Sequence, residues 1–218
     1  MPSTTQMCLT LACAIPLPGL VSCTAPPPEA PYFELVYDAA GQHTHALAQP
    51  GALGICCAAG EGRAFFGEEE IVPGEPRVIA GLRDSGRFAF STDAGLLHFS
   101  TLSVAVPPPI DFSPEPLQMA SNGVLEIRWV GASVGPDEIV SLLITHPGAV
   151  GKAAWGAVFA RKVGSASISL PGDPTIPPGS LVYLRIERAR KFVGVDYYGS
   201  PMRGEGRYTS AQRTLTVL

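Results

Sequence analysis

Proline and glycine interrupt this chain so often that long helices are disfavoured. The 218 residues include 22 Pro and 24 Gly; proline breaks helices, and both residues supply the backbone angles of tight turns. The glycines show no three-residue period, which excludes a collagen-like repeat. Because 46% of the residues are hydrophobic, the chain has enough apolar material for a folded core. We therefore expect many short elements joined by turns.

The C-terminal half alternates apolar and polar residues with period two. Leu125, Ile127 and Trp129 alternate with Glu126 and Arg128, which is the pattern of a half-buried strand. Similar runs occupy residues 139–145, 154–160, 165–170, 181–187 and 213–218, with turn signals such as Pro171-Gly172 between them. Short strands at roughly ten-residue spacing predict a β-sandwich.

The N-terminal half has looser strand candidates, at residues 32–37, 53–57, 63–66, 87–91 and 96–104. Pro107-Pro108-Pro109 then interrupts the pattern, and proline cannot donate to a strand ladder, so this tripeptide belongs at an edge, a crossover or a domain boundary. We predict an all-β protein with two modules, an N-terminal β module at 32–109 and an immunoglobulin-like antiparallel β-sandwich at 110–218. One fused sandwich is the alternative.

The N-terminus has an apolar run at residues 7–15, followed by Leu20-Val21-Ser22-Cys23. It resembles a bacterial lipoprotein signal, in which an apolar residue at −3 and a small residue at −1 precede a cysteine that becomes lipidated. The resemblance implies that residues 1–22 are a signal peptide and that Cys23 carries lipid. One departure is that no Lys or Arg precedes Arg63. Thr24, rather than Asp, follows the cysteine, which in such proteins implies the outer membrane or cell surface.

Residues 23–31 are rich in proline, with Pro26-Pro27-Pro28 and Pro31. Such a segment favours an extended polyproline conformation and is predicted to be a tether between a lipid anchor and the folded body. The apolar run is too short and too interrupted by proline to span a bilayer as a helix. The membrane is therefore a predicted partner through the lipid alone, and an ordinary cleaved signal or a cytoplasmic tail is the alternative.

Several different strand-and-turn motifs follow one another between Gly86 and the C-terminus. They are Gly86–Ser91, Phe99–Val104, Leu125–Gly131, Ser167–Pro171 and Leu215–Val217. This order resembles uncharacterised immunoglobulin-like β-sandwich proteins of bacterial envelopes. The resemblance implies no catalytic residue, and we expect no cofactor. Trp129 fits the core tryptophan of antibody domains, but no cysteine follows it to complete their disulfide.

His43 and His45 are the first candidate site. Alternate residues of a strand share a face, so two imidazoles there are able to bind Zn or Cu, with Cys56 or Cys57 as softer ligands. The alternative for the histidines is a solvated loop, since Gly41 precedes them. The alternative for the cysteines is burial as small hydrophobic residues.

Trp155, Tyr197 and Tyr198 are the second candidate, an aromatic platform of the kind that stacks on sugar rings. Their alternative role is to pack in the core or at its corners. Nucleic acid is not expected as a partner, because the chain carries 15 Lys+Arg against 19 Asp+Glu and lacks the basic balance of proteins that bind phosphate backbones.

The sequence contains no catalytic motif that we recognise. It has no Gly-x-Ser-x-Gly elbow, no His-Glu-x-x-His and no phosphate-cradling glycine loop, so we predict that the protein is not an enzyme. The expected function is a lipid-anchored binding, adhesion or scaffolding protein of the cell envelope, with an unknown protein or glycan partner. A metal-binding or hydrolytic envelope enzyme is one alternative. A structural component of a virion or other assembly is the second.

Overall fold

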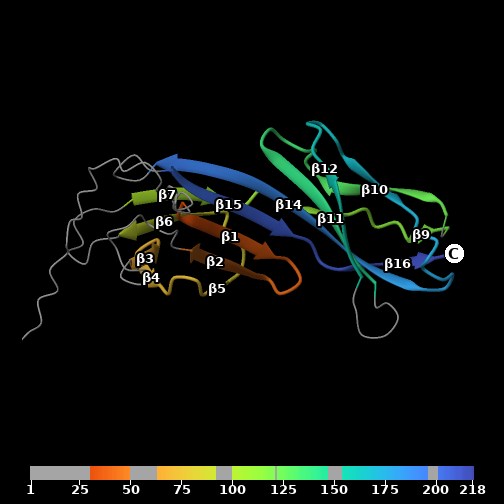
Figure 1. Cartoon of the computed structure of the whole chain (residues 1–218), viewed down its shortest axis with the longest axis horizontal. Coiled ribbons are helices and arrows are strands. Elements are labelled where there is room, and N and C mark those ends of the chain that lie inside the picture. The colour runs from red at the N-terminus through yellow and green to blue at the C-terminus, as the bar shows by residue number, and fades with distance from the viewer. Residues whose placement is uncertain (1–29, 50–62, 92–99, 121, 147–153, 196–200) are drawn as a thin grey trace, which may run out of the picture.

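The computed structural model describes residues 30–49, 63–91, 100–120, 122–146, 154–195 and 201–218, which form 16 strands and no helix (Figure 1). The strands make three sheets, one of them mixed. The all-β class predicted from the sequence is confirmed. The described part of the chain contains no apolar helix of membrane-spanning length.

The largest sheet has nine strands. In spatial order these are β12 (Ala154–Ala160), β11 (Glu138–His146), β14 (Leu181–Val195), β15 (Pro201–Thr209), β1 (Tyr32–Asp38), β2 (His43–Gln49) and β5 (Arg77–Ala80), while β16 (Arg213–Val217) pairs with β14 and β9 (Leu117–Met119) pairs with β16. The sheet is mixed because β1 runs parallel to β15 and β9 runs parallel to β16. Strands from both sides of residue 110 therefore share one sheet. The division into modules at 32–109 and 110–218 stays a prediction.

Strand β14 is the element that links the two ends of the large sheet (Figure 1). One of its edges pairs with β16 near its start and with β15 from Glu187 onward, while its other edge pairs with β11. Its residues alternate between buried and more exposed from Val182 to Arg188. One face of this strand is therefore directed into the core, as the period-two pattern predicts.

Two smaller sheets pack against that core-directed face of the large sheet. The first contains β4 (Glu69–Ile71), β3 (Arg63–Phe66), β6 (Ser85–Ser91) and β7 (Ser100–Ala105), and the second contains β13 (Ser167–Pro171), β10 (Val124–Gly131) and β8 (Ile110–Phe112). Strand β7 contacts β15, β14 and β1, whereas β8 contacts β14 and β13 contacts β12. The run of prolines at residues 107–109 connects β7 to β8, so it is a crossover between the two small sheets.

Alternating apolar residues fill the space between the sheets. Phe33 and Leu35 of β1 are fully buried, and the Phe33 ring stacks on Phe88 of β6 at a centroid distance of 5.2 Å. Ile127 of β10 and Leu184 of β14 are likewise fully buried, in the other half of the molecule. Burying each such side chain contributes about 1.5–3 kcal/mol, so both small sheets are held by hydrophobic contact.

Strand β15 is not predicted from the sequence, because glycines interrupt its apolar pattern. Its core-directed positions include Gly204 and Gly206. A Cβ atom on Gly206 would lie 1.8 Å from the carbonyl oxygen of Ala105, and one on Gly204 would lie 2.8 Å from a methyl group of Val104. Glycine inside a strand marks such a close approach of another backbone. These glycines let β7 pack directly on β15.

Candidate functional site

The two histidines predicted as metal ligands lie in β2, on the same face of the large sheet. Their rings stand edge to face with centroids 4.5 Å apart. Burial, and then the neighbouring His43, lower the pKa of His45, which favours the neutral imidazole that binds metals. Among the described residues, no group of three or more His, Cys, Asp or Glu is placed to hold a metal. Cys56 and Cys57 lie outside those residues, so the metal site stays a prediction.

The remaining predicted site residues are described only in part. Cys23, Tyr197 and Tyr198 lie outside the described residues. Trp155 belongs to β12, where its backbone pairs with Thr145 of β11, and its side chain lies outside what the structure describes. The structure therefore brings together the two histidines alone among these residues, and lipidation and the aromatic platform stay predictions.

Arg207 and three carboxylates form a cluster on the outer face of the large sheet. The outer face is the one that points away from the two small sheets. The guanidinium lies 3.1 Å from Glu34, 3.4 Å from Glu187 and 2.6 Å from Glu205. All four side chains are half-buried. Because they come from β1, β14 and β15, Arg207 joins three neighbouring strands through ion pairs.

Burial makes this cluster costly to ionise in full. It raises the pKa of Glu34 and of Glu187, and Arg207 opposes the rise in both cases. Burial also raises the pKa of the adjacent Tyr32 to about 12, assisted by Glu205 and Glu34. Three carboxylates surround a single guanidinium, so its one positive charge does not compensate all three negative charges. The cluster therefore connects neighbouring strands, and its contribution to the free energy of unfolding depends on pH.

A groove of about 260 Å³ lies on the four-stranded sheet, lined by Phe65, Gly67, Arg87, Ala89 and Thr101. Strand register places Phe65, Ala89 and Thr101 side by side on β3, β6 and β7. Ala89, in the middle, is smaller than its neighbours, which leaves a hollow between them. The backbone N–H of Gly67 donates to the carbonyl oxygen of Arg87 at 2.9 Å. A Cβ atom on Gly67 would meet nothing within 4 Å, so the groove is open beside it.

The groove combines an exposed guanidinium, a hydroxyl and an aromatic wall. Arg87 donates to the hydroxyl of Thr101 at 3.5 Å, the outer limit of a hydrogen bond. No carboxylate of the described residues forms an ion pair with Arg87. In contrast, Arg63 forms an ion pair with Glu70 and lies over the Phe65 ring, 5.3 Å from its centroid. Arg87 is therefore the cation in this groove whose charge the described residues leave uncompensated.

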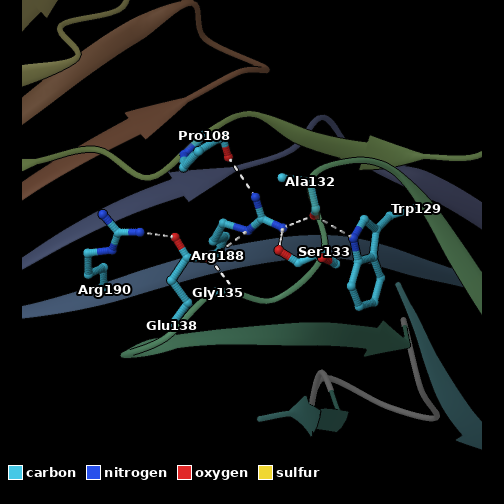
Figure 2. A network of polar contacts seen from close by, with 8 residues as sticks. All are labelled: Pro108, Trp129, Ala132, Ser133, Gly135, Glu138, Arg188 and Arg190. Carbon is cyan, nitrogen blue, oxygen red and sulfur yellow. Dashed lines mark hydrogen bonds and ion pairs between the residues drawn. The ribbon is translucent and has the colours of Figure 1, made fainter. Parts of the chain in front are cut away.

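A separate polar network surrounds the buried side chains of Arg188 and Glu138 (Figure 2). Arg188 of β14 is 0% exposed. Its guanidinium donates to the carbonyl oxygens of Ala132, of Ser133 at 3.3 Å and of Pro108 at 3.4 Å. Burial lowers the pKa of Arg188, and Glu138 opposes this. The side chain therefore connects β14 both to the crossover that contains Pro108 and to the segment that follows β10.

Glu138 supplies the negative charge of this network. Its carboxylate lies 3.8 Å from Arg188 and accepts a hydrogen bond from Arg190 at 2.6 Å and one from the Gly135 N–H at 2.9 Å. The indole N–H of Trp129 donates to the same Ala132 carbonyl as Arg188, at 3.1 Å. The terminal nitrogens of Arg188 and Arg190 donate to protein acceptors, whereas the buried Nε atoms of both residues have no hydrogen-bond partner among the described residues. The contacts of this network lie within the protein, so it serves the fold.

The sequence predicted that Phe65, Arg87, Ala89 and Thr101 lie in strands but did not mark them, or Gly67, as a site. Phe65, Arg87 and Thr101 are far apart in the sequence and meet only through strand pairing. The available signal was the small size of Ala89 between bulky neighbours, and that signal has meaning only once the register is known.

No protein-family model matches this chain, and a search of curated protein sequences found no match either.

Proposed function

We propose that this chain is a non-enzymatic binding or scaffolding protein of the cell envelope, exported and held at a membrane surface by a lipid on Cys23. The observation that carries the proposal is the groove on the four-stranded sheet. Its guanidinium, hydroxyl and aromatic ring converge on an open hollow of about 260 Å³. Polar groups converging on a concave, partly apolar surface are typical of ligand-binding sites.

The use of charged residues elsewhere supports binding rather than catalysis. Arg207 and its three carboxylates pair with one another across neighbouring strands. Arg188 and Glu138 are enclosed between the sheets. In both clusters the charges are committed to the fold, whereas a catalytic group must reach a substrate.

The finer architecture that we propose is an immunoglobulin-like sandwich in the C-terminal part of the chain. Two features support it. The sheet of β13, β10 and β8 packs against the large sheet, and Trp129 of β10 is buried between them with 6% exposure. A buried tryptophan on a central strand is a hallmark of immunoglobulin domains.

The anchor is supported by the sequence around Cys23 and by where the fold begins. The first strand, β1, starts at Tyr32 and enters the middle of the large sheet. As extended polyproline, residues 23–31 would span roughly 25–30 Å at about 3.1 Å per residue. That length would separate the folded body from a bilayer surface.

The test is fractionation of the native cells. We expect the wild-type protein to sediment with membranes and to be released only by detergent, because a lipid holds it there. A Cys23→Ser variant should appear in the soluble fraction, whereas the matched variant Cys13→Ser should behave as wild type. Equal partitioning of the wild type and the Cys23→Ser variant would refute the anchor.

A further inference from the structure

We propose that the groove lined by Phe65, Arg87 and Thr101 binds a carboxylate-bearing sugar residue, such as a uronic acid of an acidic polysaccharide. This inference rests on the proposed function as an envelope binding protein and names the class of its ligand. Arg87 and Thr101 would hold the carboxylate and an adjacent hydroxyl. Phe65 would pack against the C–H face of the sugar ring.

Charge is the first reason to expect an anion. Among the described residues, Arg63 is paired with Glu70 and Arg77 with Glu69, but Arg87 has no carboxylate partner. A guanidinium presents five N–H donors in a planar fork that matches a carboxylate, and Arg87 uses one of its nitrogens in a long contact with Thr101. Its other N–H groups have no acceptor among the described residues, and Arg87 lines the groove.

Size and shape favour a single ring. The volume of about 260 Å³ falls just below the 300–1,000 Å³ of pockets that enclose drug-sized ligands. The floor is flat because Ala89 offers only a methyl group between Phe65 and Thr101. An aromatic wall beside such a floor packs well against the apolar face of a sugar.

Backbone geometry favours a sugar over an extended peptide. A peptide that binds a sheet obtains its main affinity by adding a strand at an edge. The groove lies over β6, which has β3 on one side and β7 on the other, so its backbone groups are already paired. A peptide lying there would leave its own N–H and C=O groups to water, whereas sugar hydroxyls need only side-chain partners.

The proposal is tested by calorimetric titration of the full chain, purified in detergent, with tetragalacturonate and with an uncharged galactose tetramer. We expect the wild type to bind the acidic oligomer and not the neutral one. Arg87→Gln should weaken binding about tenfold or more, the loss expected when a charge-assisted hydrogen bond is removed. Ala89→Leu should abolish binding by filling the floor. Arg83→Gln, which makes the same charge change outside the groove, should bind as wild type.

Three results would overturn the proposal. They are no heat of binding with the acidic oligomer at millimolar concentration, an equal loss of affinity in Arg83→Gln and Arg87→Gln, and tighter binding of a glutamate tetrapeptide than of tetragalacturonate. Unfolding midpoints of the variants, compared with wild type, separate loss of the site from loss of the fold. Because the titration does not depend on the lipid, its failure leaves the anchor on Cys23 standing, and failed fractionation leaves the sugar site standing.

Discussion

Replacing Arg188 with methionine should remove a large part of the stability of the fold. The side chain is 0% exposed and donates hydrogen bonds to three carbonyl oxygens. It also forms an ion pair with Glu138 at 3.8 Å. Methionine fills most of the volume but offers no donor. Breaking a buried ion pair by removing one partner costs about 3–5 kcal/mol. The free energy of unfolding of a domain is about 5–15 kcal/mol, so the variant should lose between about a fifth and nearly all of its stability.

The assay is urea unfolding followed by circular dichroism and by tryptophan fluorescence. The chain has two tryptophans, and one of them, Trp129, shares the Ala132 carbonyl with Arg188, so part of the emission reports on the same region. Arg128→Met is the matched control, because the Arg128 side chain is 75% exposed and lies 3.6 Å from Glu126, so its loss should cost less than about 1 kcal/mol. A loss below about 1 kcal/mol for Arg188→Met, or equal losses in both variants, would refute the structural role of Arg188.

Two further perturbations follow from the same structure. Gly206→Ala should destabilise the protein by at least about 3 kcal/mol, because its Cβ would lie 1.8 Å from the Ala105 carbonyl oxygen, and neither backbone can move freely; an unfolding midpoint equal to that of Gly123→Ala would contradict this. Burial raises the pKa of Glu34, so its contribution to stability is present below the usual carboxyl pKa and is lost as pH rises through the raised value. The Glu34→Gln variant has no carboxylate to ionise at this position and so avoids that loss of stability. In urea titrations, the free energy of unfolding of the variant minus that of the wild type should increase from about pH 4 to about pH 7. A decrease would contradict the raised pKa.

Local patterns were enough to predict most strands that have alternating apolar residues. The predicted ranges 63–66 and 154–160 agree with β3 and β12, and the alternation around Trp129 identified β10. The strand predicted at 181–187 continues to Val195, because residues after Glu187 pair with β15. The candidate at 53–57 lies outside the described residues.

The strands and pairings that the sequence did not predict depend on contacts between residues far apart in the chain. The residues His43–Gln49 were open to a loop interpretation and form β2, which β1 and β5 hold on both sides. Strand β15 depends on glycines whose purpose is visible only beside β7. The parallel pairing of β1 with β15 joins segments from opposite ends of the chain, and no local pattern encodes it. The groove around Ala89 depends on such pairing too.

The most direct test of the envelope proposal is the intact mass of the protein purified from its native cells, beside a Cys23→Ser variant. We expect the wild type to lack residues 1–22 and to carry added acyl mass that the variant lacks, because processing of a lipoprotein signal leaves a modified cysteine at the new N-terminus. A wild-type protein that retains Met1 or Pro2 and carries no added mass would contradict export and lipid anchoring.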